Sequence, residues 1–398
     1  MSARPVGRSR RARGLISQRV ERLSPSGIRR FFDLLSTMED VISLGVGEPD
    51  FATPWHISEA AISGIEKGYT MYTSNRGMLE LRQELARNLS VRYGLEYAPD
   101  DELLITVGVS EGLDLAMRAV INPGDEVISP EPTYVSYNSC AILAGGVFVP
   151  VPTTAENEFR VKAADIEERV TGRTKAILLG YPNNPTGAVM GRADLEEIAE
   201  VAQRRDLIVI SDEIYDQLVY GVKHTCFASL PDMRGRTILL GGFSKSYAMT
   251  GWRVGYAAAP AEIIEAMTKI HQYTMLCAPI TGQMAAMEAL KSGEPSVREM
   301  VADYDRRRRV MVKGLNAIGL SCFEPKGAFY AFPSVKVTGL SSQEFAEKLL
   351  IEERVAVVPG SAFGESGEGY VRCCYATALD DIREALRRMR RFVQRHRL

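Results

Sequence analysis

The 398-residue sequence lacks the features of several protein classes. No apolar run approaches the roughly 20 residues that a membrane-spanning helix needs, so we expect no membrane role. The 48 basic residues nearly balance the 50 acidic ones, which leaves no overall field to attract nucleic acid or anionic lipid. Five arginines precede residue 14, but the apolar segment of a secretory signal is missing, which favours a cytoplasmic location.

Cysteine and histidine are scarce, and neither is spaced as in a metal site. The six cysteines form no CxxC pair, and the adjacent Cys373 and Cys374 are too constrained for an ordinary disulfide with each other. The four histidines show no mutual ligand spacing. We therefore expect reduced thiols, most of them in the core, and no metal.

The middle of the sequence alternates between two kinds of pattern. Short apolar, β-branched segments are separated by helical patterns such as that of 194–204; the segments are 103–107, 126–129, 147–151, 176–179, 207–210, 237–240 and 254–258. This alternation predicts an α/β fold, with a mostly parallel seven-stranded sheet flanked by helices.

The chain is longer than one hydrophobic core usually allows, so we expect a large and a smaller domain. After about Ser292, charged helical patterns at 297–318, 342–352 and 380–396 surround short strand segments at 328–332, 356–358 and 370–375. We predict a flexible basic arm at 1–16, a large domain at 51–291, and a small α+β domain built from 17–50 and 292–398. The arginine run at 306–309 is predicted to be a solvated helix face.

Polar residues directly follow several predicted strands, where ligands bind in open α/β sheets. Gly108–Ser110 opens a helix and offers N–H groups and a hydroxyl to a phosphate, although an ordinary N-cap serine would look the same. Asn184 could form only a turn with Pro185, and Asp212 could belong to a structural ion pair.

Lys245 stands between two serines, after small and apolar residues and ahead of Arg253. A lysine held among apolar groups and near another cation has a destabilised ammonium, and its neutral amine can form a Schiff base. The alternative is a lysine that extends to solvent, as most lysines do.

With these residues in order, the chain resembles the fold-type I, class I pyridoxal 5′-phosphate-dependent aminotransferases, and most closely the archaeal and bacterial branch that includes aromatic amino acid aminotransferases. The resemblance runs from about Ser17 to the C-terminus. It is carried by LGVGEPDF at 44–51, NPTG at 184–187, SDEIY at 211–215, SK at 244–245, MTGWR at 249–253 and YVR at 370–372. Each motif alone is common, but the set in this order is specific.

The resemblance implies an enzyme that moves an amino group between an L-amino acid and a 2-oxo acid such as 2-oxoglutarate by a ping-pong path. Aromatic or other neutral amino acids are the favoured donors. Lys245 would carry the cofactor and later move a proton between the substrate Cα and C4′ of the cofactor, and Asp212 would keep the pyridine nitrogen protonated.

The resemblance also implies the remaining contacts. Asn184 and Tyr215 would bind O3′ of the cofactor, and Tyr134 would stack on its ring. The phosphate would be held by Val109, Ser110, Ser244 and Arg253, and the substrate by Arg372, the Gly47 backbone, Tyr134 and Asn184.

Tyr72 matches a tyrosine that reaches the phosphate of the partner subunit, which implies a homodimer with shared active sites. Two positions depart from the pattern of the family. Gly242 stands where many relatives carry a phosphate-binding serine. Ser110 stands where some aspartate-specific relatives carry a lysine, which disfavours a dedicated aspartate enzyme.

Two other functions deserve comparison. A carbon–sulfur lyase of the same fold keeps the same lysine, aspartate and arginine, so it stays open as the alternative. A transcription regulator with an aminotransferase-like domain would need a helix-turn-helix domain ahead of the core. Fewer than about twenty residues precede the matching region, which is too few for such a domain.

Overall fold

The computed structural model describes residues 15–23 and 38–398. Most of the arm predicted at 1–16, and the stretch 24–37 of the predicted small domain, lie outside the described residues. Within them, a short helix α1 (Gln18–Glu21) precedes the main body of the fold.

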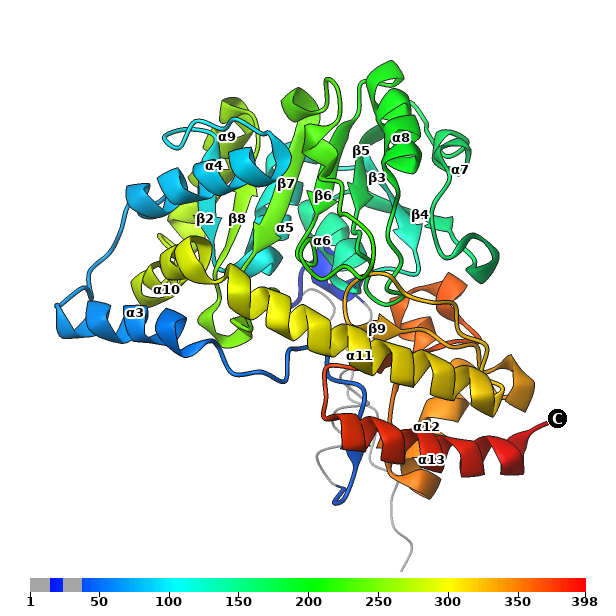
Figure 1. Cartoon of the computed structure of the whole chain (residues 1–398). Coiled ribbons are helices and arrows are strands. Elements are labelled where there is room, and N and C mark those ends of the chain that lie inside the picture. The colour runs from blue at the N-terminus through cyan, green and yellow to red at the C-terminus, as the bar shows by residue number, and fades with distance from the viewer. Residues whose placement is uncertain (1–14, 24–37) are drawn as a thin grey trace, which may run out of the picture.

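A seven-stranded sheet forms the centre of the molecule, in the order β2-β8-β7-β6-β5-β3-β4 (Figure 1). Neighbouring strands are parallel except at β8, which is antiparallel to both β2 and β7. Every segment predicted for this sheet forms a strand: β2 (Leu103–Thr106), β3 (Glu126–Glu131), β4 (Val147–Pro152), β5 (Thr174–Leu179), β6 (Ile208–Asp212), β7 (Thr237–Gly242) and β8 (Gly255–Ala258).

Helices cover both faces of this sheet because successive strand residues point to opposite sides. In β5, Ala176 and Leu178 pack in the same core as α5 and α9, whereas Ile177 and Leu179 pack in the core of α8. The helices of this part are α3 (Trp55–Glu66), α4 (Leu79–Tyr93), α5 (Gly108–Val120), α6 (Ser136–Ala144), α7 (Ala163–Glu167), α8 (Arg192–Arg204), α9 (Ala261–Thr274) and α10 (Ile280–Ser292).

Two small sheets lie outside the large one, and one of them joins segments from both ends of the chain. In one, β1 (Ile42–Ser43) pairs in parallel with β10 (Val355–Ala356). The other is antiparallel, in the order β11-β12-β9, and consists of β9 (Tyr330–Ala331), β11 (Val358–Pro359) and β12 (Val371–Cys374). The accompanying helices, below the large sheet in Figure 1, are α11 (Glu294–Ile318), α12 (Ser342–Glu353) and α13 (Leu379–His396).

Two local predictions are wrong. The single strand predicted at 356–358 is divided at Val357, because β10 pairs with β1 and β11 pairs with β12. The arginine run is not a solvated face throughout, because Arg307 and Arg308 are buried. Their charges are compensated by Asp50 at 2.7 Å from Arg307 and by Asp305 at 2.7 Å from Arg308.

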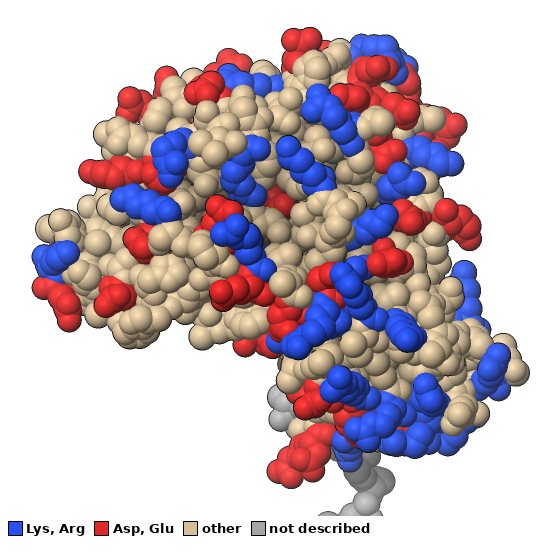
Figure 2. Space-filling model, viewed as in Figure 1, with Lys and Arg blue, Asp and Glu red and all other residues tan. Residues whose placement is uncertain are grey.

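Charges of both signs are mixed over most of the face in Figure 2, and basic side chains gather over α13. Arg391 and Arg395 of this helix each lie 2.7 Å from Glu353, so part of the positive charge is compensated. All six cysteines are free and four of them are buried, which confirms the predicted core thiols. In the part of the chain that the structure describes, no helix is long and apolar enough to cross a bilayer.

Candidate active site

A cavity of about 570 Å³ opens at the carboxyl ends of β2, β5, β6 and β7, and residues near β9 and β12 close it from the other side. This is the edge of the sheet where ligands of open α/β folds bind. All of the predicted site residues except Tyr72 line it: Gly47, Val109, Ser110, Tyr134, Asn184, Asp212, Tyr215, Ser244, Lys245, Arg253 and Arg372.

Asp212 is the last residue of β6 and is buried. Its Oδ2 accepts a 2.9 Å hydrogen bond from the hydroxyl of Tyr137, and its Oδ1 accepts one of 3.2 Å from the backbone N–H of Ile214. Burial raises the pKa of Asp212 to about 6, although both hydrogen bonds act in the opposite direction. Within the described chain, its hydrogen-bond partners are the Tyr137 hydroxyl and the Ile214 N–H, and no basic side chain forms an ion pair with it, so it would favour a cationic ligand.

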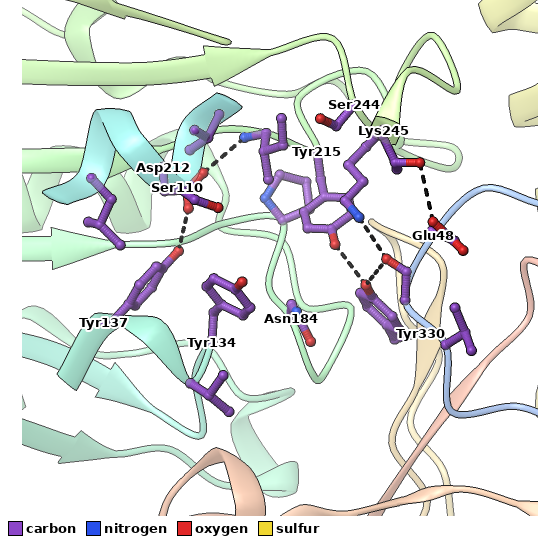
Figure 3. A pocket seen from close by; sticks show the side chains of 18 of the residues that line it. Glu48, Ser110, Tyr134, Tyr137, Asn184, Asp212, Tyr215, Ser244, Lys245 and Tyr330 are labelled. Atoms are coloured by element: carbon purple, nitrogen blue, oxygen red, sulfur yellow. Dashed lines mark hydrogen bonds between the residues drawn. The ribbon is translucent and has the colours of Figure 1, made fainter. Parts of the chain in front are cut away.

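Lys245 follows β7 and reaches into the same cavity as Asp212 (Figure 3). Its Nζ donates a 2.6 Å hydrogen bond to the carbonyl of Gly47. Burial lowers the pKa of Lys245 to about 8, and the charges of Arg372 and Arg253 act in the same direction. The alternative of a lysine that extends to solvent is therefore wrong.

Arg372 lies on β12 and is buried. Its two terminal nitrogens donate to Oδ1 of Asn184 at 2.8 Å and to the carbonyl of Gly45 at 2.7 Å, and its guanidinium lies over the ring of Tyr330 at 4.5 Å. Its Nε is buried without a partner in the described chain. The planar donor is thus fixed in orientation and keeps an unused N–H.

The turn between β2 and α5 forms a further wall of the cavity. Gly108 has a φ of +73°, which favours glycine, and a Cβ there would lie 2.6 Å from Nη2 of Arg253 and would displace that guanidinium. At one end of the cavity, the lining therefore consists of Val109 and Ser110, at the start of α5, and of Arg253. An N-terminal helix turn beside an arginine suits an anion.

Gly242, where a serine was expected by resemblance, stands in a tight place. A Cβ added there would lie 3.1 Å from Cγ2 of Val109, 3.1 Å from Cδ1 of Ile214 and 3.2 Å from Cα of Gly255. Packing around this end of β7 therefore disfavours a side chain at 242.

Tyr215 and Tyr134 come from different sides of the cavity. The hydroxyls of Tyr215 and Tyr330 are 2.7 Å apart, and Tyr134 meets Tyr137 edge to face with ring centroids 5.8 Å apart. Tyr72 does not line the cavity, and its side chain is 82% exposed.

Sequence reasoning missed Tyr137 and Tyr330. Tyr137 lies three residues after Tyr134, at the start of α6, and this spacing could have suggested a second aromatic residue at the site. Tyr330 lies on β9, and nothing in the sequence shows that this strand comes next to the segment after β6.

These residues fit pyridoxal 5′-phosphate. A buried carboxylate without a basic partner suits a protonated ring nitrogen, and a helix start beside Arg253 suits a phosphate. An amine of lowered pKa lies in the same cavity, where it suits an aldehyde.

Comparison with known proteins decides the family. The pattern of the family described as "Aminotransferase class I and II" matches residues 39–389. The chain belongs to this family. It is a pyridoxal 5′-phosphate-dependent aminotransferase, which confirms the activity, the cofactor and the fold expected from the resemblance.

Relatives of this aminotransferase match along nearly their whole length. The aspartate aminotransferase of Pyrococcus abyssi is 48% identical, over 96% of this chain and 99% of the relative. Aromatic-amino-acid aminotransferase 2 of Thermococcus litoralis is 46% identical, over 96% of this chain and 99% of the relative. The crystal structure of an aromatic aminotransferase from Pyrococcus horikoshii OT3 superposes with a TM-score of 0.88 at 48% identity, over 92% of this chain and 99% of that one.

Proposed function

We propose that Lys245, Asp212 and Arg372 carry the transamination, and that aromatic or other neutral L-amino acids are its preferred donors. The observation that supports this most strongly is the shared cavity, in which the Lys245 amine, the Asp212 carboxylate and the Arg372 guanidinium meet. When bound, pyridoxal 5′-phosphate supplies an aldehyde for the amino group and a ring that withdraws electrons from the substrate Cα.

Lys245 would hold the cofactor and move the proton. Because its pKa is lowered to about 8, a useful fraction of Nζ is neutral near neutral pH and can accept a proton from the substrate Cα. Asp212 would hold a proton on the ring nitrogen, because a cation beside it relieves the cost of its own buried charge. Tyr134, Asn184 and Tyr215 would orient the ring, and Val109, Ser110, Ser244 and Arg253 would bind the phosphate.

Arg372 would bind the α-carboxylate that all amino acid and 2-oxo acid substrates share. Its position in the cavity wall, with both terminal nitrogens held by hydrogen bonds, supports this role. The backbone N–H of Gly47 would complete the carboxylate site, since Gly47 lines the same cavity as Arg372. Tyr134 and Asn184 lie close enough to the cavity to contact the same substrate.

The charge of the cavity supports neutral donors. Among its described lining residues, the basic ones are Lys245, Arg253 and Arg372, and each already has a role toward the cofactor or the α-carboxylate. Ser110 adds no cation for a side-chain carboxylate, and Tyr134 and Tyr330 offer aromatic surface. The acceptor would be a 2-oxo acid such as 2-oxoglutarate, whose second carboxylate would have no dedicated basic partner among the described residues of the cavity.

A panel of amino donors with 2-oxoglutarate tests this proposal. We expect phenylalanine and tyrosine to give a higher kcat/KM than aspartate, and each donor to yield one equivalent of its 2-oxo acid per glutamate formed. Preference for aspartate would contradict the proposed specificity. Release of ammonia and pyruvate from cysteine or cystathionine without any acceptor would instead favour the carbon–sulfur lyase.

We also propose a homodimer in which Tyr72 contacts the phosphate site of the partner subunit. Large apolar side chains are exposed in two segments, with Met71 70% and Tyr273 87% exposed besides Tyr72. The amide of Asn75 donates a 2.6 Å hydrogen bond to the carbonyl of Leu276, so the two segments lie side by side. An exposed apolar patch of this kind suits a symmetric interface.

Coexpression of two defective variants tests shared sites. Tyr72→Ala should lower cofactor affinity, and Lys245→Ala should abolish turnover. A mixed dimer would contain one intact site, made of Lys245 from one chain and Tyr72 from the other, so activity should reappear at limiting cofactor. Mixed dimers, verified by mass, that remain inactive would contradict the proposal.

We propose that 51–291 is the large domain and that 17–50 and 292–398 together form the small one. The pairing of β1 with β10 and the position of β2–β8 within one sheet support this division. The proposed catalytic groups Lys245 and Asp212 then belong to one domain, and the carboxylate-binding Gly47 and Arg372 to the other. Substrate binding would draw the two domains together.

A further inference from the structure

Two buried side chains behind the β2–α5 turn have no role in the function described so far. Glu111 lies in the first turn of α5, and His271 lies on α9. Oε1 of Glu111 is 2.6 Å from Nδ1 of His271, and the two side chains are 8% and 0% exposed. Oε2 of Glu111 accepts a 2.5 Å hydrogen bond from the backbone N–H of Val107. Glu111 therefore joins the end of β2 to a helix that lies elsewhere in the sequence.

The turn that Glu111 supports is tightly constrained. The hydroxyl of Thr106 donates a 2.9 Å hydrogen bond to the carbonyl of Gly108. On the opposite side, a Cβ at Gly255 would lie 2.7 Å from the backbone N of Val109, so β8 packs directly against the turn. Displacement of Val107 would move the N–H groups of Val109 and Ser110, which line the cavity.

The position of Glu111 also raises an electrostatic question. A carboxylate in the first turn of a helix is favoured by the helix dipole, but it would repel a phosphate bound at the same helix end. Both oxygens of Glu111 are engaged away from the cavity, one by an N–H and the other by an imidazole nitrogen. The Glu111 carboxylate thus supports the turn through one oxygen, and its other oxygen contacts His271 instead of pointing to the phosphate site.

We propose that Glu111 and His271 are positioning residues for the cofactor phosphate. By holding Val107, the pair fixes the start of α5 so that the backbone of Val109 and Ser110 can bind the phosphate. This inference rests on the proposed phosphate site. The pair touches neither the substrate nor the proposed catalytic groups, so its effect is on cofactor affinity and not on the chemical step.

Two matched pairs of variants separate this support from general damage to the fold. Glu111→Ala removes both contacts, whereas Glu111→Gln keeps an acceptor for the Val107 N–H and a partner for His271. His271→Leu removes the polar contact, whereas His271→Asn retains a polar group close to the position of Nδ1. The full-length proteins are stripped of cofactor and titrated with pyridoxal 5′-phosphate and, separately, with pyridoxal, which lacks the phosphate.

We expect Glu111→Ala and His271→Leu to weaken pyridoxal 5′-phosphate binding by about tenfold or more, which is the order of a lost charge-assisted hydrogen bond. Pyridoxal binding should stay within about twofold of wild type, because the ring and aldehyde sites are unchanged. The Gln and Asn variants should recover most of the affinity, and kcat at saturating cofactor should be preserved. Inorganic phosphate should raise the Tm of the wild-type apoprotein more than that of the Ala and Leu variants.

Equal loss of pyridoxal and pyridoxal 5′-phosphate binding would overturn the proposal, because it would show damage beyond the phosphate site. Wild-type affinity for pyridoxal 5′-phosphate in folded Ala and Leu variants would also overturn it. If Glu111→Ala does not fold, the two His271 variants decide by the same criteria. A wild-type protein that binds pyridoxal as tightly as its phosphate ester would instead refute the phosphate site itself.

Discussion

The hydroxyl of Tyr137 donates a 2.9 Å hydrogen bond to Oδ2 of Asp212, and both residues are buried. Tyr137 fits because residue 180 is glycine: a Cβ there would lie 2.2 Å from the Tyr137 hydroxyl oxygen. This tyrosine is a main stabiliser of the ionised carboxylate, since burial alone raises the pKa of Asp212.

Tyr137→Phe should therefore raise the pKa of Asp212 further and weaken its hold on the ring nitrogen. We expect kcat to fall about tenfold, with the acidic limb of the pH profile moved to higher pH. Tyr181→Phe is the matched control, because it removes another buried hydroxyl, which donates to the Phe159 carbonyl. If both variants lose activity equally, the Tyr137 bond has no specific role.

Asp212→Asn should stabilise the apoprotein at neutral pH while it weakens the cofactor site. The folded pKa of about 6 lies above the ordinary value of 3.8, so the protonated form is favoured by folding. The carboxyl group then contributes stability that is present below pH 3.8 and lost as the pH rises through 6. Removing the charge should add about 3 kcal/mol to the free energy of unfolding at pH 7 to 8, and little near pH 4.

Urea unfolding of the apoproteins over this pH range measures the effect of Asp212→Asn. Asp206→Asn serves as control, because the Asp206 side chain is 95% exposed and should change stability by less than about 0.5 kcal/mol. A stability difference for Asp212→Asn that does not depend on pH would contradict the assigned pKa shift.

Arg372→Lys should mainly impair recognition of the α-carboxylate. A lysine cannot offer two parallel N–H groups, nor place a guanidinium over the ring of Tyr330. We expect kcat/KM for phenylalanine to fall about 100-fold, with much less effect on slow turnover of phenethylamine, which has no carboxylate. Arg308→Lys, at a buried arginine paired with Asp305, should leave the ratio of the two substrates unchanged.

Gly242→Ser introduces the hydroxyl that the resemblance led us to expect at this position. Because its Cβ would crowd Val109, Ile214 and Gly255, we expect a lower Tm and no gain in cofactor affinity. Thermal unfolding and cofactor titration measure both quantities. Tighter cofactor binding at an unchanged Tm would show that packing does not explain the glycine.

The large sheet was predictable because its seven strands are continuous apolar runs between helical patterns. The short strands of the two small sheets were harder to predict. Val355–Pro359 reads as one apolar segment, and its division between two sheets depends on partners at Ile42 and Arg372, far away in the sequence. The burial of Arg307 similarly depends on Asp50, which no local pattern connects to it.

Most of the cavity was predictable because its residues follow strands of one sheet and stand in recognisable motifs. The side chains that support these cavity residues from behind were not predictable. Tyr137, Glu111 and His271 act through hydrogen bonds to residues on other elements, and their sequence neighbourhoods resemble ordinary helix interiors. Such contacts appear only when the helices are packed.

The attachment of the cofactor to Lys245 is the central claim, and chemical trapping tests it most directly. The holoenzyme is reduced with sodium borohydride, digested, and mapped by peptide mass spectrometry. The account predicts a pyridoxyl group on Lys245, close to one per chain. A pyridoxyl group on any other lysine, with Lys245 unmodified, would contradict it.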